Sequence, residues 1–469
     1  MKQRNSRRKF LKNSTYASAF LGMSACGVYQ KKAEMTAKDV LAEITKKRPS
    51  TNTSVMGLKV DPIKKVRIAM IGCGDRGLGL LYQFNALCPD MATIVALCDV
   101  REKMVQRSVD YLREHGNERP QTYTGSLTAW KEMVERDDID FVIVATPWED
   151  HVPMSVYAMQ QGKHVGVEVP AAYTLEGCWQ LVDTAEETQR NCMMLENVCY
   201  GDEEMWLLNM AHAGVFGTLN YAEAAYIHDL RAGLFNNATY NNWRMQHHIV
   251  RDGNLYPTHG LGPVAQYMDI QRGDKFEYLV SMSSPQSALS EYARTVDADN
   301  EFHDRTDFAH GDMNNSLIKT NKGRSILVQH DVVTPRPYDR KNVLSGTKGY
   351  HQGYPSKMSL DGHGHHFLEG KAYEKLRQTY RHSMWNRLQE RIDRHKGGHG
   401  GMDFVMAYRI IECFNKGIAL DQDIYDGVAW SVVGPLSKIS IEMGSSPVPF
   451  PDFTRGKWEE KRRLEIIES

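Results

Sequence analysis

The segment NLYPTHGLGP, residues 254–263, places two side chains that can move protons close together. Tyr256 and His259 lie three residues apart in a stretch rich in Gly and Pro, which predicts a short loop. An imidazole titrates near neutral pH, so His259 suits a general acid or base, and a phenol can transfer a proton or bind a hydroxyl. His228 is a weaker second candidate for proton transfer. The plainer alternative is that His259 packs in the interior and is satisfied by the backbone.

A glycine-rich turn upstream predicts a dinucleotide site. In KKVRIAMIGCGDRG, the apolar run 66–71 is followed by Gly72, Gly74 and Gly77 at the G-x-G-x-x-G spacing. The first glycine permits the tight turn, the second lets the backbone approach a pyrophosphate, and the third allows a helix to pack closely on the strand. Asp99 ends the next apolar run about 20 residues later, where a carboxylate binds the ribose. The pattern favours NAD over NADP.

Apolar runs alternate with helical patterns through this part of the chain. IDFVIVATP, KHVGVEVP and NCMMLENV each end in polar or functional residues, and helical stretches separate them. This alternation predicts a Rossmann domain with a doubly wound parallel sheet over residues 61–204. Ligands bind at the carboxyl ends of such strands. We therefore expect these strand ends to line the cofactor cleft: Trp148, Glu149, His151, Glu168, Val169 and Asn197.

The pattern changes in residues 205–469. Several strand-like runs with helices favour an α+β domain with an open, mostly antiparallel sheet that forms the substrate wall. Two histidine-rich stretches, DGHGHHFLEG and HKGGHGGMD, invite a metal interpretation, but their glycines imply loops, so we expect no metal site. These stretches hold His363, His365, His366, His395 and His399.

The N-terminal residues are typical of an export signal. Arg7 and Arg8 precede a mildly apolar run, and a small-residue box ends at Cys26. We expect residues 1–26 to be a twin-arginine signal, with Cys26 as a lipidated first residue that anchors the protein in the periplasm or cell envelope. A basic amphipathic tail is the alternative. Residues 27–60 are polar and predict a tether.

The composition excludes several classes of protein. The formal net charge is −1, which argues against nucleic acid as a partner. No apolar run reaches the roughly 18 residues of a membrane-spanning helix. The chain has no CxxC pair, and its cysteines are expected to be buried free thiols.

The N-terminal motifs and the EVP strand end resemble the Gfo/Idh/MocA oxidoreductase family. In the dehydrogenases of that family the strand ends Glu-Lys-Pro, and the lysine assists hydride transfer. Here the position is Val169, which can neither donate nor accept a proton. Seven stretches in order resemble one branch, glycoside hydrolase family 109, the NAD-dependent α-N-acetylgalactosaminidases. They are GCGDRG, ATPWEDH, VEVPAA, MLENVCYG, YIHDLR, NLYPTHGLGP and GGHGGMD.

The resemblance implies a set of site residues, carried over position by position. The implied cofactor residues are Arg76, Gly77, Leu78, Asp99, Trp148, Glu149, Asp150, His151, Glu168, Val169 and Asn197. The implied substrate residues are Tyr226, Arg244, Tyr256, Pro257, Thr258, His259 and Tyr338. Of these, His259, Tyr256 and Tyr338 are the candidates for catalysis, and Arg244 could hold negative charge or a sugar oxygen.

The resemblance also implies a mechanism and a partner. Tightly bound NAD would oxidise the sugar C3 hydroxyl, the C2 proton would be removed, the glycosidic oxygen would leave by elimination, and water addition and reduction would complete a redox-neutral cycle. The partner is a glycan with terminal α-N-acetylgalactosamine, and relatives of the fold often associate into homo-oligomers. Two alternatives remain: a plain NAD-dependent sugar dehydrogenase, and a non-catalytic sugar-binding lipoprotein. The residue that acts at C2 is not assigned.

Overall fold

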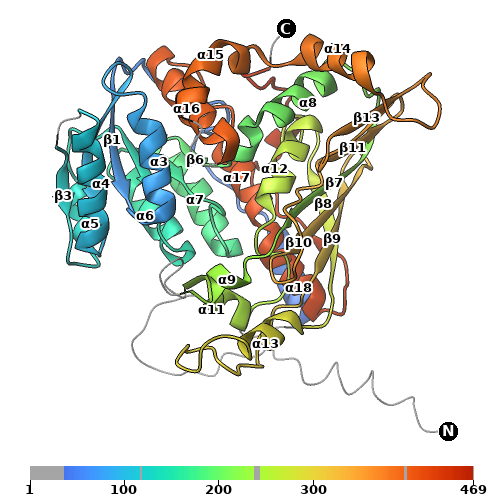
Figure 1. Ribbon diagram of the computed structural model, residues 1–469, viewed down its shortest axis with the longest axis horizontal. Helices are drawn as coiled ribbons and strands as arrows, with labels where there is room; N and C mark the ends of the chain where they lie inside the picture. The colour runs from blue at the N-terminus through green and yellow to red at the C-terminus, as the bar shows by residue number, and fades with distance from the viewer. Residues whose placement is uncertain (1–35, 117–118, 237–242, 396–398, 468–469) are drawn as a thin grey trace.

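A computed structural model of the chain describes residues 36–116, 119–236, 243–395 and 399–467. Two sheets organise this part of the chain, with a layer of helices between them (Figure 1). Arg7, Arg8 and Cys26, which carry the predicted export and lipidation signals, lie outside the described residues. Within the described ranges, no helix is long and apolar enough to cross a membrane.

The first sheet has six parallel strands in the order β3-β2-β1-β4-β5-β6. This is the Rossmann order, so the predicted doubly wound parallel sheet is confirmed. Its strands are β1 (Val66–Ile71), β2 (Ala92–Cys98), β3 (Gln121–Tyr123), β4 (Phe141–Val144), β5 (His164–Val167) and β6 (Cys192–Met194). The connecting helices are α3 (Asp75–Asn85), α4 (Glu102–Glu114), α5 (Ala129–Val134), α6 (Trp148–Gln160) and α7 (Leu175–Thr188).

The second sheet has eight strands in the order β13-β12-β11-β7-β10-β9-β8-β14. Strand β10 runs parallel to β7 and the other neighbours run antiparallel, which confirms the expected mostly antiparallel sheet. The strands are β7 (Leu219–Ile227), β8 (Phe276–Ser283), β9 (Asn314–Thr320), β10 (Ser325–Asp331), β11 (Val343–Gly346), β12 (Gly349–Gln352), β13 (Lys357–Leu360) and β14 (Val448–Pro449).

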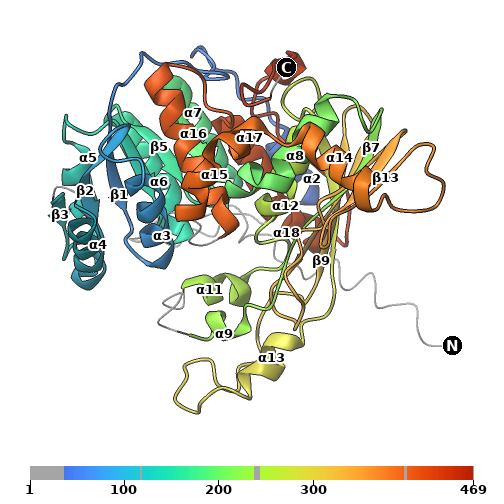
Figure 2. The same cartoon turned by 45° about the horizontal axis from the view of Figure 1, so that its top comes forward.

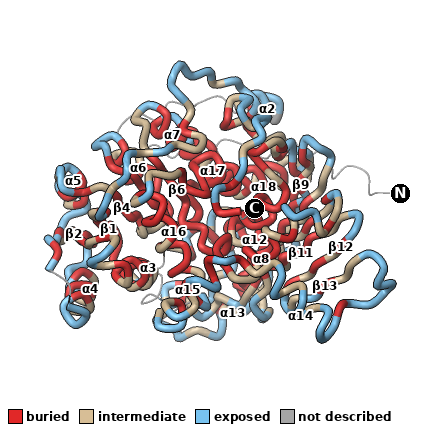
Figure 3. Tube along the Cα trace, turned by 90° about the horizontal axis from the view of Figure 1, so that it is seen from above, coloured by how far each residue is buried: buried red, intermediate tan, exposed pale blue. Residues whose placement is uncertain are grey.

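Helices fill the space between the two sheets. Helix α12 packs on β7, α18 packs on β8, and α17 contacts both α7 and β6. Figure 3 shows that buried residues concentrate in this layer, around α8, α12 and α17. The helices concerned are α8 (Asp202–His212), α12 (Thr258–Tyr267), α17 (Ile424–Ser431) and α18 (Val433–Glu442). This helical layer contacts β6 of the first sheet through α17 and the second sheet through α12 and α18.

Two later segments complete the architecture. Helices α14 (Gly370–Tyr380), α15 (Ser383–Arg394) and α16 (Met402–Lys416) follow the second sheet, and α16 returns to pack against α3 and β1 of the first. Helices α9 (Arg231–Leu234), α11 (Trp243–Val250) and α13 (Ala288–Ala293) lie together at one end of the molecule, between β7 and β9 in the chain (Figure 2). This arrangement brings Arg76 of α3 and Asp403 of α16 together beside the end of β6, where Glu196 and Asn197 lie.

The loop predicted for NLYPTHGLGP is only half correct. Helix α12 begins at Thr258, so His259 stands in its first turn, and Pro257 is the preceding cap residue. The glycines serve packing instead of a turn, because a Cβ on Gly260 would lie 2.3 Å from the backbone N of Ala225 in β7. Close contact with the sheet, invisible in a local pattern, decides the glycine content here.

One of two other segments follows the predicted order of strand and helix, and the second differs from the expected local structure. The PWEDH stretch begins helix α6 at Trp148, with Glu149 and Asp150 in its first turn, where acidic side chains complement the helix dipole. Part of the expected tether forms helix α2 (Ala37–Thr45), which a Thr36–Asp39 capping box starts. Its Val40 and Ile44 are buried, so this helix packs on the body of the protein.

Candidate active site

The glycine turn after β1 has the shape that a dinucleotide requires. Gly72 has a φ of 93°, and a Cβ there would lie 2.4 Å from the Ala145 carbonyl oxygen. A Cβ on Gly77 would lie 1.9 Å from the Gly72 oxygen, so both positions demand glycine for packing. A Cβ on Gly74 would meet nothing nearer than the Arg101 guanidinium at 3.4 Å, which leaves open space beside the backbone. The turn therefore fits a pyrophosphate at the α3 N-terminus.

The carboxylate expected to bind ribose lies beside this turn. Asp99 follows β2 and accepts hydrogen bonds from the backbone N of Cys73 at 2.8 Å and of Arg101 at 2.9 Å. These bonds fix the buried carboxylate next to the glycine turn. A carboxylate accepts hydrogen bonds, so its position fits an adenosine ribose whose two hydroxyls are free to donate.

A buried ion-pair network lies at the carboxyl edge of the first sheet. Arg76 donates from Nε to Glu168 Oε1 at 2.7 Å and from its two Nη atoms to Asp403 at 2.9 and 3.1 Å. Asn197 Nδ2 donates to Asp403 Oδ1 at 2.7 Å, and His399 Nδ1 lies 2.9 Å from Asp403 Oδ2. Two predicted cofactor residues, Arg76 and Asn197, therefore meet on Asp403, to which sequence reasoning gave no role, and Arg76 links a third, Glu168, to the network.

The network predicts an acid-sensitive contribution to stability. Burial alone would raise the pKa of Asp403, but the charge of Arg76 and hydrogen bonds from His399 and Arg76 outweigh it and hold that pKa below its usual range. A depressed carboxyl pKa stabilises the fold above the unfolded value of about 3.9, and the contribution is lost as pH falls toward the folded pKa.

We expect Asp403→Asn to lower the free energy of unfolding at pH 7 by about 1–3 kcal/mol, because two charged hydrogen bonds are weakened. Urea titrations should show the gap between wild type and variant closing as pH falls below about 4. Asp361→Asn, on an exposed turn, is the matched control. A gap that stays constant with pH would contradict this role of the carboxylate.

Aromatic side chains and one arginine gather beside the network. The Tyr256 ring centroid lies 4.6 Å from that of Tyr226 and 4.9 Å from that of His259. The Arg244 guanidinium from α11 lies 4.8 Å from the Tyr256 ring and 5.3 Å from the Trp148 ring. The structure thus brings predicted substrate residues from β7, α11 and α12 against a predicted cofactor residue at the start of α6.

His259 is oriented by a buried carboxylate. Its Nδ1 lies 2.7 Å from Glu196 Oε1, and the Glu196 side chain has no exposed surface, while that of His259 is 12% exposed. A carboxylate accepts only, so Nδ1 carries the proton and Nε2 is the basic atom. Glu196 stands inside the quoted MLENVCYG stretch but received no prediction. A carboxylate one residue before Asn197 was the available signal.

We expect Glu196→Gln to lower kcat about 10- to 100-fold with little change in KM, because an amide can donate to Nδ1 and reverse the tautomer of His259. Steady-state kinetics and the NAD content of the purified variant test this. Glu277→Gln, exposed on β8, serves as control. A change in KM with kcat preserved would contradict a positioning role.

The pKa values around His259 separate a base from hydrogen-bond donors. Burial raises the pKa of Tyr256 well above its usual value, and Arg244 offsets this only in part. Desolvation around the hydroxyl also raises the pKa of Tyr338, although 39% of this residue is exposed, and the hydroxyl accepts a hydrogen bond from Arg340 at 3.1 Å. Burial, with Arg244 and His259, lowers the pKa of His228 to about 4. Both phenols therefore stay protonated at neutral pH, and His228 is a weak base.

Other predicted residues lie near the site in supporting positions. His151 is buried, with its two ring nitrogens 2.8 Å from the Pro170 oxygen and 2.9 Å from the Thr146 oxygen, so it joins α6 to the strand ends. Glu149 lies 3.0 Å from His247 of α11. Leu78, Val169, Pro257 and Thr258 are buried, and Asp150 is half-buried. Their roles toward cofactor or substrate stay predictions.

The histidine-rich stretches do not converge. His363, His365 and His366 are exposed on one turn, and His399 is engaged with Asp403. In the part of the chain that the structure describes, no group of three or more metal-binding side chains is placed to hold an ion.

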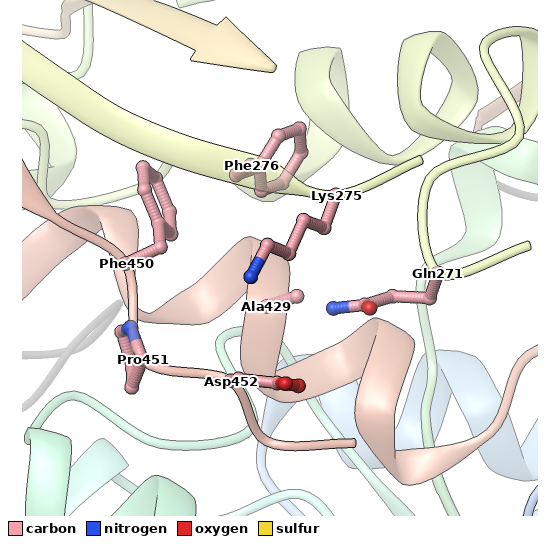
Figure 4. A pocket seen from close by; sticks show the side chains of 7 residues that line it. All are labelled: Gln271, Lys275, Phe276, Ala429, Phe450, Pro451 and Asp452. Atoms are coloured by element: carbon pink, nitrogen blue, oxygen red, sulfur yellow. The ribbon is translucent and has the colours of Figure 1, made fainter. Parts of the chain in front are cut away.

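A small cavity lies elsewhere in the second domain. Gln271, Lys275 and Asp452 converge on it between α17 and the start of β8 (Figure 4). Its volume of about 10 Å³ has room for about one water molecule. It is too small for a sugar and lies apart from the His259 cluster.

Comparison with known proteins agrees with this geometry. Residues 66–196 match the oxidoreductase family with an NAD-binding Rossmann fold, and residues 200–460 match the C-terminal domain of glycosyl hydrolase 109. A glycosyl hydrolase family 109 protein of Shewanella pealeana is 46% identical over 98% of this chain and 99% of its own length. An alpha-N-acetylgalactosaminidase of Shewanella oneidensis is 47% identical over 90% of this chain and 92% of its own.

Solved structures share the fold. A levoglucosan dehydrogenase in complex with NADH and L-sorbose has a TM-score of 0.63 and 16% identity, and the alignment covers 83% of this chain and all of that one. The NAD-binding domain makes NAD the cofactor, and the C-terminal domain makes the protein a glycoside hydrolase. The chain therefore belongs to glycosyl hydrolase family 109, within the Gfo/Idh/MocA fold.

Proposed function

We propose that this glycosidase removes terminal α-N-acetylgalactosamine through a redox-neutral cycle in which NAD stays bound. The observation that carries the proposal is the His259–Glu196 pair, with Nδ1 and Oε1 2.7 Å apart, beside the tyrosines and Arg244. This pair supplies an imidazole whose orientation is fixed by a buried carboxylate, as a general base requires. The name of the Shewanella oneidensis relative supports the choice of sugar and linkage.

The residues divide the work according to their protonation. When bound, NAD+ supplies a hydride acceptor for the sugar C3 carbon and returns the hydride at the end. His259 Nε2 takes the proton from C2, which a neighbouring ketone acidifies, while Glu196 holds Nδ1–H and stabilises the imidazolium that forms. The protonated hydroxyls of Tyr256 and Tyr338 donate hydrogen bonds to sugar oxygens. Arg244 stabilises the negative charge that develops on the enolate oxygen.

Val169 sets this chain apart from the ordinary dehydrogenases of the fold. Its side chain is buried at the end of β5, beside Glu168, where the resemblance places the lysine of ordinary dehydrogenases. A valine cannot relay the proton of a hydroxyl under oxidation. Oxidation of the C3 hydroxyl is common to the proposed cycle and to a dehydrogenase, so in both reactions a group other than Val169 takes the hydroxyl proton.

Deuterium incorporation tests the proposed chemistry. The enzyme hydrolyses an aryl α-N-acetylgalactosaminide in D₂O, and proton NMR follows C2 of the released sugar. We expect deuterium at C2, because His259 exchanges its proton with solvent before it returns one. Full turnover with the original C2 hydrogen retained would exclude deprotonation at that carbon. Accumulating NADH without aryl release would instead identify a dehydrogenase.

Export remains part of the proposal. The twin-arginine motif at Arg7 and Arg8 and the box that ends at Cys26 support transport of a folded, NAD-loaded protein to the periplasm or cell envelope, with a lipid on Cys26. Mass spectrometry of the mature N-terminus tests this, and a chain that retains Met1 would exclude processing. Homo-oligomer formation likewise stays a prediction, which sedimentation velocity tests.

A further inference from the structure

We propose that Tyr354 is a platform for the sugar unit on the leaving side of the scissile bond, and that this unit is a neutral pyranose. The inference rests on the proposed function and extends it from the terminal sugar to the aglycone. Tyr354 lies in the turn between β12 and β13, and it received no prediction from the sequence. With 36% of its surface exposed, the residue is open to a ligand.

A line of aromatic contacts runs from the buried imidazole to this tyrosine. The Tyr226 ring centroid lies 5.3 Å from that of His259 and 6.4 Å from that of Tyr338. The Tyr338 centroid lies in turn 5.9 Å from that of Tyr354. Exposure rises along this line, from 8% for Tyr226 to 39% for Tyr338 and 36% for Tyr354. A glycan whose terminal sugar reaches His259 therefore extends toward Tyr354 on its way to water.

Backbone contacts fix the position of the two exposed tyrosines. Ile227 at the end of β7 and Asp339 exchange two backbone hydrogen bonds, at 3.1 and 2.9 Å, which hold the loop after β10 against that strand. Gly353 donates from its backbone N to the Lys341 oxygen at 2.8 Å, and a Cβ on Gly353 would lie 2.7 Å from that oxygen. The turn that carries Tyr354 is thus fixed to the same loop.

A buried arginine orients the two rings. The Arg340 guanidinium carbon lies 5.4 Å from the Tyr338 ring and 5.3 Å from the Tyr354 ring. The same guanidinium donates to the Tyr338 hydroxyl at 3.1 Å and to Glu204 Oε1 at 2.8 Å, and both Arg340 and Glu204 are buried. A ring that is held in place before binding loses little conformational entropy when a sugar stacks on it.

The chemistry of these aromatic faces favours a neutral sugar. One face of a pyranose carries mostly C–H groups, which pack on an aromatic ring, whereas a carboxylate or sulfate would meet the negative face of that ring. The nearby Arg340 is paired with Glu204 at 2.8 Å. Lys341 is likewise paired with Asp339 at 3.1 Å. An anionic sugar or an acidic peptide would therefore find no free cation at either residue.

Paired substrates test the inference. Each variant cleaves α-N-acetylgalactosaminyl-1,3-galactose and methyl α-N-acetylgalactosaminide, which share the scissile sugar but differ in whether the aglycone has a ring. Chromatography follows the released N-acetylgalactosamine. We expect Tyr354→Ala to lower kcat/KM about 10-fold on the disaccharide and little on the methyl glycoside, because one aromatic contact is lost. Tyr354→Phe keeps the ring and should restore most of the disaccharide rate.

A matched control separates this role from a structural one. Tyr278→Ala removes a tyrosine of similar exposure, 37%, from β8 and should change neither rate. Bound NAD and thermal unfolding are measured for every variant. An equal loss on both substrates in Tyr354→Ala, or no loss on either, would overturn the platform.

Two further substrates test the chemical class of the aglycone. Faster cleavage of a disaccharide with galacturonic acid in place of galactose would overturn the preference for a neutral sugar. A loss in Tyr354→Ala that is confined to a peptide carrying N-acetylgalactosamine on threonine would assign the tyrosine to peptides and overturn the sugar platform. Wild type that releases no N-acetylgalactosamine from any of these substrates would instead refute the proposed function.

Discussion

Replacing His259 by Asn should lower kcat for 4-nitrophenyl α-N-acetylgalactosaminide by about 10²–10⁴-fold, the usual contribution of a positioned general base. The physical reason is the loss of Nε2, the basic atom that the Glu196 contact at 2.7 Å leaves available. Asparagine preserves polarity at a position that is only 12% exposed, so the fold should persist. Deuterium exchange at C2 of free N-acetylgalactosamine should disappear with turnover.

The readouts for this variant distinguish chemistry from binding. NAD content after purification and the KM for the aryl glycoside should stay near wild type, because the cofactor turn lies on other elements. His365→Asn, on the exposed turn, should keep full activity. A variant of His259 that retains wild-type kcat would show that another group removes the proton.

Replacing Gly74 by Val should abolish retention of NAD without unfolding the protein. The Gly74 backbone has φ −64° and ψ −167°, which any residue adopts, and a Cβ there would meet nothing within 3.4 Å. The branched side chain would instead occupy the space where the backbone approaches the pyrophosphate. We expect affinity for NAD to fall at least about 100-fold, which corresponds to about 2.7 kcal/mol.

The measurement pairs cofactor content with thermal unfolding. Added NAD should raise the unfolding temperature of wild type and leave that of Gly74→Val unchanged, since a ligand stabilises only the state that binds it. Gly79→Val is the matched control, because Gly79 lies in α3, the helix that Gly74 caps, and a Cβ there has open space around it. NAD retained in Gly74→Val would place the pyrophosphate elsewhere.

The sequence predicts the helices and strands more accurately than the contacts between them. The strand over residues 66–71, the turn at Gly72 and the cluster of Tyr226, Tyr256 and His259 follow from local patterns and from the family resemblance. Local patterns carry periodicity and turn chemistry, which are properties of neighbours along the chain. These features were therefore predictable.

The carboxylates that orient the site were not predictable in this way. Glu196 contacts a residue 63 positions away, and Asp403 contacts one 327 positions away. These contacts form only when α12, which carries His259, and α16, which carries Asp403, pack against the sheets. Gly260 and Gly262 led to the wrong prediction of a loop for the same reason. Both are glycines because a Cβ would come too close to residues distant in the chain, Ala225 for Gly260 and Glu196 for Gly262.

The most direct test follows aryl release and NADH together. Protein purified without added cofactor is incubated with 4-nitrophenyl α-N-acetylgalactosaminide, and nitrophenol and NADH are recorded in the same sample. The account predicts many nitrophenol molecules for each bound NAD, with no accumulation of NADH. NADH formed in proportion to sugar consumed, with no nitrophenol, would contradict the account and make the protein a sugar dehydrogenase.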